Sequence, residues 1–153
     1  MTIDATSRST NYRDSVIKYF YDNLSGIELS FDKSLSTPKI QGSEIERWVV
    51  INFKALERGS MCSSYIELIP CTRKDPEGFK LAQLADLLYS LVKDSSKSDG
   101  MARIPLYRCH PSQAWTVLGA ILVTEIRESE EMDYEDLTKF KIITLRLQWA
   151  AIV

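Results

Sequence analysis

The sequence has few of the residues from which metal and nucleotide sites are usually built. Its 153 residues include one histidine, three cysteines and six glycines. The glycines nowhere form a GxGxxG or phosphate-loop spacing, so no nucleotide site is predicted. Cys62, Cys71 and Cys109 lack the closely spaced pairs of structural zinc sites, so neither a metal nor a cofactor is expected. An odd count without a framework pattern instead favours small buried thiols in a reducing compartment.

Positive charge and long apolar runs are also scarce. The 19 lysines and arginines are outnumbered by 21 aspartates and glutamates, which gives a net charge of −2 and a pI of about 5.5. Without a basic field, specific nucleic-acid binding is not expected as the main activity. No apolar run reaches the length of a membrane span, and the first ten residues do not resemble a secretory signal. We therefore expect synthesis inside the cell and no membrane partner.

The one pair with the chemistry of a nucleophile and a base is Cys109-His110. Adjacent side chains of an extended chain point to opposite faces, and no Asp or Asn is placed by the sequence to orient the imidazole. The sequence therefore predicts no catalytic residue. A small enzyme that uses this pair remains an alternative, and it predicts a reactive thiol at Cys109.

The apolar pattern predicts a flexible polar arm at residues 1–10 and a single domain over residues 11–153. Apolar side chains recur every four residues after residue 11, which predicts a helix that Gly26 ends in the left-handed conformation. Strict alternation over residues 27–31 predicts a half-buried strand. Residues 34–46, with a proline and a glycine, have the composition of a surface loop.

The middle of the chain has the pattern of a β-β-α unit. Strands are predicted at residues 47–56 and 62–72, joined by a polar turn into an antiparallel hairpin. A helix over residues 75–92 follows, for which Asp75 is a suitable N-cap and Pro76 a suitable first residue. Its leucines have helical spacing and are expected to pack on the sheet.

The last third of the chain predicts three more strands, at residues 104–108, 115–127 and 139–149. The acidic segment between the last two, residues 128–136, is expected to be a solvated turn. It lacks the alternating acidic ladder and central glycine of a calcium loop. The order is therefore α-β-β-β-α-β-β-β: an α+β fold with a single mainly antiparallel sheet of about six strands and two helices packed on it.

This order of elements resembles the tail terminator proteins of long-tailed bacteriophages, of the lambda type. The likeness covers nearly the whole chain and rests on element order and residue character. The segments that carry it are Tyr12–Phe20 (YRDSVIKYF), the strand ending in Phe31-Asp32, Arg47–Phe53 (RWVVINF), the Leu- and Ala-rich Phe79–Leu88, and a closing hairpin.

The resemblance implies a structural virion protein without enzymatic activity, assembled in the host cytoplasm. A homo-hexameric ring would sit on the last ring of tail-tube protein, stop polymerisation, and join to a head-tail connector or head-completion protein. DNA would pass through as cargo without specific binding. The turn over residues 55–63, the acidic segment and the apolar C-terminus become candidate contact regions. The candidate contact residues are Glu57, Arg58, Met61, Glu130, Glu131, Asp133, Tyr134, Trp149, Ile152 and Val153.

Two alternatives to a tail terminator have similar small α+β designs. One is another neck, head-completion or tail-tube protein. The other is a cellular binding module that dimerises through an edge strand, which predicts a stable two-subunit species that does not grow into rings.

Overall fold

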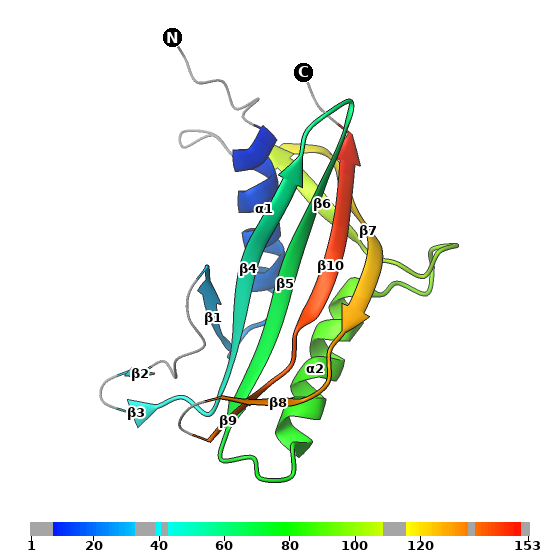
Figure 1. Ribbon diagram of the computed structural model, residues 1–153. Coiled ribbons are helices and arrows are strands. Elements are labelled where there is room, and N and C mark those ends of the chain that lie inside the picture. Colours follow the sequence, from blue (N-terminus) through cyan, green and yellow to red (C-terminus); the bar gives the residue numbers. More distant parts are fainter. Residues whose placement is uncertain (1–7, 33–38, 41–42, 109–115, 135–136, 151–153) are drawn as a thin grey trace.

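The computed structural model describes residues 8–32, 39–40, 43–108, 116–134 and 137–150 (Figure 1). The helices are α1 (Arg8–Asn23) and α2 (Phe79–Val92). The strands are β1 (Glu28–Phe31), β2 (Lys39–Ile40), β3 (Ser43–Glu44), β4 (Arg47–Glu57), β5 (Met61–Arg73), β6 (Arg103–Arg108), β7 (Thr116–Glu128), β8 (Met132–Tyr134), β9 (Thr138–Phe140) and β10 (Ile143–Ala150). Neither helix is long and apolar enough to cross a membrane.

The α+β class is confirmed, but the main sheet is mixed and includes β8 and β9 beside β5. The expectation of a single sheet was wrong, because β2 and β3, within the segment expected to be a loop, form a separate two-stranded sheet. Six strands follow one another in the order β1-β4-β5-β10-β7-β6. All neighbours from β4 onward are antiparallel, including the expected β4–β5 and β7–β10 pairs. β1, however, runs parallel to β4, with Glu28 opposite Trp48 and Phe31 opposite Ile51. Parallel neighbours need a long connection, and the chain between β1 and β4 supplies one.

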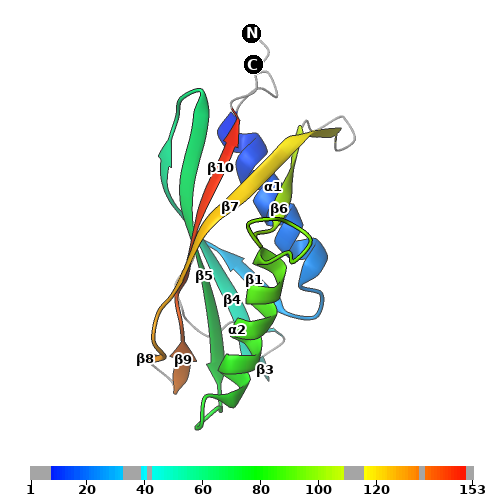
Figure 2. The same ribbon diagram turned by 90° about the vertical axis from the view of Figure 1, so that its right-hand side faces the viewer.

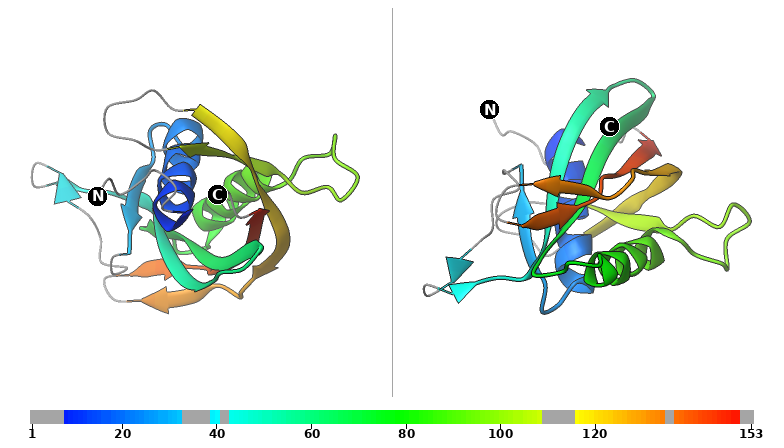
Figure 3. Two further views of the ribbon diagram at one scale, coloured as in Figure 1. Left: turned by 90° about the horizontal axis from the view of Figure 1, so that it is seen from above. Right: turned by 60° about the horizontal axis from the view of Figure 1, so that its bottom comes forward.

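The two helices lie on the same side of the sheet, and the sheet curls around α1 (Figures 2 and 3). The main core lies between the helices and the inner face of the sheet, because both surfaces present an apolar stripe. Its fully buried side chains include Val16, Phe20, Leu88, Leu68 and Leu145. Burying a side chain of this size stabilises the fold by roughly 1.5–3 kcal/mol.

α1 is longer than expected, since it begins at Arg8 and not near residue 11. Residues 8–10 contain neither proline nor glycine, so they extend the helix into the expected arm. The rest of that arm, residues 1–7, lies outside the described residues. At the other end Gly26 has a φ of 80°, as the C-terminal stop signal predicted.

α2 begins at Phe79, so the expectation of a helix starting at Asp75-Pro76 was wrong. The N–H of Gly78 donates to the carbonyl of Asp75 at 3.1 Å, which closes a turn before the helix. Gly78 then takes the left-handed conformation at the N-cap position. Asp75 still serves the helix from a distance: its carboxylate accepts the N–H groups of Lys80 at 3.1 Å and Leu81 at 2.9 Å.

The acidic segment and the final strand also differ from expectation. Met132–Tyr134 form β8 and are not part of an open turn. The single strand expected over residues 139–149 is divided into β9 and β10. The division has a packing reason, because Phe140 and Ile142 cover a second apolar cluster on the outer face of the sheet while Ile143 begins the inward-facing series of β10. The second cluster consists of Trp48, Val50, Ile69 and Cys71.

Replacing Gly78 with alanine should lower the free energy of unfolding by about 1–2 kcal/mol, because an L-residue is strained in the left-handed region. The new Cβ would also lie 2.5 Å from Glu131 Oε1 and push this carboxylate from the N-terminus of α2, where it is favourable. Urea unfolding measures the change. Gly26→Ala is the matched control, since its φ is also positive but nothing lies within 4 Å of its Cβ. A Gly78→Ala protein as stable as the parent would contradict the placement of Gly78.

Candidate interaction surfaces

The described part of the chain contains no cluster of His, Cys, Asp and Glu that could hold a metal ion. Cys62 and Cys71 are free and buried. Burial raises the pKa of the Cys71 thiol to about 12, so its reactive thiolate is scarce at neutral pH. The Cys109-His110 pair lies outside the described residues. Among the described residues, the surfaces available for contact with a partner are the exposed hairpins and the outer face of the sheet.

The first exposed element is the tip of the β4–β5 hairpin, at the upper end of the sheet in Figure 1. β5 continues to Met61, opposite Ala150 of β10, and the turn that precedes it is exposed. Met61 is 52% exposed. A solvated methionine is an adaptable apolar contact. Glu57 and Arg58 flank it as exposed charges, so the tip has an apolar centre with a polar border.

The second exposed element, which we call the acidic hairpin, comprises β8, β9 and the chain that precedes β8 from Glu128. Lys139 pairs with both Glu131 at 3.4 Å and Asp133 at 3.1 Å. The hydrogen bond to Asp133 is the main cause that raises the pKa of Lys139. Glu130 is exposed and has no ion pair among the described residues. Carboxylates thus outnumber the lysines, and the hairpin presents a negative surface.

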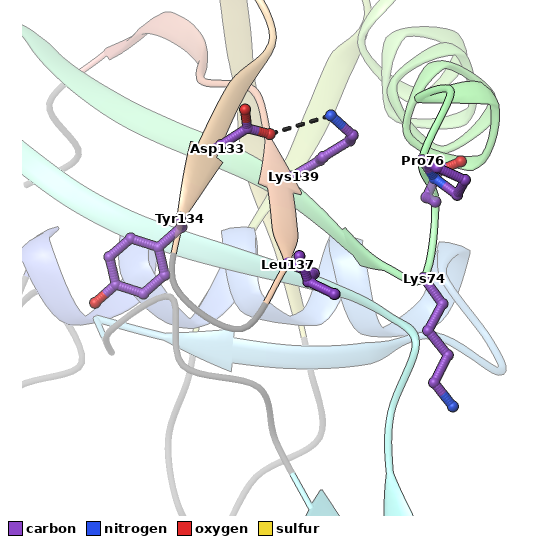
Figure 4. Close-up of a pocket in the computed structure, with 7 residues that line it drawn as sticks. Lys74, Pro76, Asp133, Tyr134, Leu137 and Lys139 are labelled. Carbon is purple, nitrogen blue, oxygen red and sulfur yellow. Dashed lines mark hydrogen bonds and ion pairs between the residues drawn. The ribbon is translucent and has the colours of Figure 1, made fainter.

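A pocket of about 440 Å³ separates the acidic hairpin from the turn between β5 and α2 (Figure 4). Its lining residues are Lys74, Asp75, Pro76, Asp133, Tyr134, Leu137 and Lys139. Leu137 is 83% exposed and has a φ of 59°, a conformation that is strained for a bulky residue. The mixture of four charged side chains with Leu, Tyr and Pro suits contact with another protein, because apolar anchors and a polar rim occur together at protein interfaces.

The outer face of the sheet beside the second apolar cluster is polar and not covered by a helix (Figure 2). Lys54 pairs with Glu67 at 3.4 Å, and Arg127 pairs with Glu125 at 2.7 Å. A smaller pocket, of about 220 Å³, lies on this face. The residues that line it are Tyr65, Glu125, Arg127, Thr144 and Arg146. This site was missed from the sequence, although the polar residues that alternate with apolar ones along residues 143–149 mark an uncovered face.

Near two edges of the sheet, side chains accept hydrogen bonds from backbone N–H groups. The N–H of Tyr107 on β6 donates to Ser15 Oγ of α1 at 2.8 Å. The N–H of Phe53 on β4 donates to Asp32 Oδ1 at 2.9 Å, just beyond the end of β1. An added strand would need these donors, so both contacts oppose pairing of a further strand at these positions.

The structure places the described candidate contact residues in three settings: the β4–β5 tip, the acidic hairpin and, for Trp149, the core. Glu57, Arg58 and Met61 are exposed at one end of the sheet. The four candidates of the acidic hairpin lie at the other end, where Glu130, Glu131, Asp133 and Tyr134 are exposed. Ile152 and Val153 lie outside the described residues. The hairpin tip and the acidic hairpin are therefore not brought together (Figure 1).

Trp149 requires a correction, because it is a core residue and not a surface contact. Its side chain is 2% exposed. The indole stacks on Tyr12 of α1, with ring centroids 4.3 Å apart and an interplanar angle of 10°. Alternation along β10 turns Trp149 inward together with Leu145 and Leu147, so proximity to the chain end did not imply exposure.

Comparison with known proteins identifies a shared fold only. No family model matches the chain, and no curated protein sequence matches it either. One of the similar solved structures has a TM-score of 0.54 and 13% sequence identity to this chain. The match covers 89% of this chain and 94% of the other. At that identity the likeness extends to the architecture of the two chains and no further.

Proposed function

We propose that this protein is a structural subunit of a phage tail, a tail terminator that forms a hexameric ring. The ring would cap the tail tube, stop its polymerisation and offer a joining surface to a head-tail connector or head-completion protein. The observation that carries the proposal is the placement of two exposed hairpins, of different chemistry, at opposite ends of one sheet (Figure 1).

A terminator needs two separate contact surfaces, because it binds the tube on one side and the head on the other. The β4–β5 tip offers an exposed methionine between charges, and the acidic hairpin offers a negative surface beside a pocket. The two surfaces differ in charge and apolar character, so they suit two different partners. The two surfaces are separated by the length of β4 and β5, which have 11 and 13 residues. A strand rises by about 3.3 Å per residue.

The ion pairs on the outer face of the sheet reduce the attraction of this face for DNA. The pairs Lys54–Glu67 and Arg127–Glu125 neutralise two cations within the chain itself. Binding to DNA draws on cations that neutralise phosphates, so a face with internally paired charges holds DNA weakly. DNA would then pass the ring as cargo without specific binding. The blocked backbone donors of Tyr107 and Phe53 disfavour the alternative of a dimer built by edge-strand pairing at those positions.

The test is a polymerisation assay with purified tail-tube protein, followed by negative-stain imaging. We expect the protein to appear as a ring at one end of shortened tubes. Met61→Asp should weaken capping or head joining by about 10-fold or more, because a charge would replace an apolar contact residue. Lys97→Glu, in the exposed loop between α2 and β6, is the control and should leave both activities unchanged.

A substitution beside the pocket of the acidic hairpin should affect the other partner. Leu137→Asp, at a side chain that is 83% exposed, is expected to impair whichever of the two activities Met61→Asp leaves intact. Circular dichroism checks that each variant is folded. A chain that forms a strict dimer and leaves tube length unchanged would overturn the proposal and favour the cellular binding module.

A further inference from the structure

Arg146 lies in the middle of the outer sheet face, and its guanidinium Nε has no hydrogen-bond acceptor among the described residues. It stands on β10 between Tyr65 of β5 and Glu125 of β7. The Nε is also buried. A buried donor that is left unsatisfied costs free energy, and more so when the group is charged. An acceptor that enters the adjoining pocket, which Arg146 lines, would bind the guanidinium and offset part of this cost.

The pocket around Arg146 has the size and chemistry for one small anionic group. Glu125 is not a hydrogen-bond partner of Arg146 Nε, and its Oε1 accepts from Arg127 Nε at 2.7 Å. The pocket of about 220 Å³ also contains the hydroxyl-bearing side chains of Thr144 and Tyr65. A guanidinium presents parallel N–H groups that match the two oxygens of a carboxylate, and hydroxyls can donate further hydrogen bonds to it.

The charges on this face favour a carboxylate over the phosphates of DNA. Glu67 and Glu125 lie beside the pocket on the neighbouring strands, opposite Thr144 and Arg146 respectively. A nucleic-acid strand carries a row of phosphates, so it would bring negative charge against these two carboxylates. The acidic hairpin brings less uncompensated charge, because Lys139 pairs with Glu131 and Asp133 and Lys141 pairs with Glu128. The net charge of −2 for the whole chain gives no long-range attraction for nucleic acid either.

We propose that the Arg146 pocket receives a carboxylate from the acidic hairpin of a second copy of this chain. The hairpin has such groups to offer, because Glu130 has no ion pair among the described residues and Glu131 and Asp133 share Lys139. The hairpin of the same chain continues away from Arg146, since Glu128 already pairs with Ile143, three residues earlier on β10. A contact between two different patches of identical chains is heterologous, the type that closes into rings. The inference rests on the proposed function for its ring geometry.

The test is sedimentation equilibrium of the whole chain over a wide concentration range at low salt. Arg146→Gln should raise the dissociation constant for self-association by about 10-fold or more, as expected for the loss of a partly buried charge pair. Arg127→Gln removes the same charge from the same pocket and is the matched control. Because Arg127 is already paired with Glu125, its loss should change the constant by less than about 3-fold.

A charge exchange makes the proposal specific to the acidic hairpin. Arg146→Glu and Glu130→Arg should each weaken association, and the double variant should recover most of it because the attraction is restored with reversed signs. If Glu130→Arg associates as the parent does, and a variant with Glu131→Gln and Asp133→Asn also does, the hairpin is not the partner. Thermal unfolding of each variant separates loss of contact from loss of fold.

Several results would overturn this proposal. A parent chain that stays monomeric at every concentration would do so, as would an Arg146→Gln variant that associates normally. Weaker duplex binding by Arg146→Gln with unchanged self-association would show instead that the pocket binds phosphate. The tube assay keeps the two proposals separate. Association that depends on Arg146 without capping would remove the terminator function alone, whereas normal rings of Arg146→Gln on tubes would remove only this contact.

Discussion

Trp149→Ala is expected to lower the free energy of unfolding by about 3–5 kcal/mol, the cost of removing a fully buried indole and leaving a cavity. The ring is 2% exposed and stacks on Tyr12, whose hydroxyl in turn donates to Ser64 Oγ at 2.8 Å. Trp149 therefore joins β10 to α1 and, through Tyr12, to β5. Guanidinium unfolding monitored by far-UV circular dichroism measures the change, because this signal does not depend on the tryptophan that is removed.

Trp149→Phe is the control for this prediction. Phenylalanine keeps an aromatic ring against Tyr12, and the indole Nε1 is buried without a hydrogen-bond partner among the described residues. No side-chain hydrogen bond is lost there, so the cost should stay near 1–1.5 kcal/mol, about that of a modest change in core volume. If Trp149→Ala cost less than about 1 kcal/mol, the core position of the ring would be contradicted.

Asp75→Ala is expected to destabilise the protein by about 2–4 kcal/mol, because a buried carboxylate that accepts several hydrogen bonds is removed and its donors are left unsatisfied. The side chain is 6% exposed. It accepts from the N–H groups of Lys80 and Leu81 and from Thr72 Oγ1 at 3.1 Å. Asp75 thereby connects the end of β5 to the start of α2. Urea unfolding at neutral pH measures the loss, and Glu77→Ala, an exposed neighbour, is the control with little expected effect.

The same carboxylate predicts how stability responds to acid. Burial alone would raise the pKa of Asp75, but hydrogen bonds from the backbone of Leu81 and Lys80 and from Thr72 outweigh it, and the pKa is lowered. A lowered folded-state pKa contributes stability that is present above the unfolded value of about 3.9 and is lost as pH falls through the folded value. Asp75→Asn should therefore lose less stability than the parent between about pH 4 and pH 2. If the free energy of unfolding fell equally with pH in the parent and in Asp75→Asn, the lowered pKa of Asp75 would be contradicted.

Patterns local to the chain were sufficient to predict most elements. The four-residue apolar spacing predicted α1, and the left-handed stop at Gly26 was confirmed. The β4–β5 hairpin, the end of α2 at Val92 and the antiparallel β7–β10 pair were also predicted. These features depend on periodicity and on the backbone preferences of single residues, which neighbours in the sequence reveal. The exposure of the acidic segment followed from its run of charged residues.

The remaining features depended on contacts between distant segments, which no local pattern contains. Pairing with β4 decided that β1 is parallel, and the need to cover Trp48 divided the last strand into β9 and β10. The inward turn of β10 placed Trp149 in the core, because one register of a strand decides which alternate residues are buried. The same register aligned Arg146 with Tyr65 and Glu125 from two other strands. The sequence by itself thus determined the helices, the strands and their α+β class, whereas only the tertiary structure decided strand direction, register and the side chains that meet across the sheet.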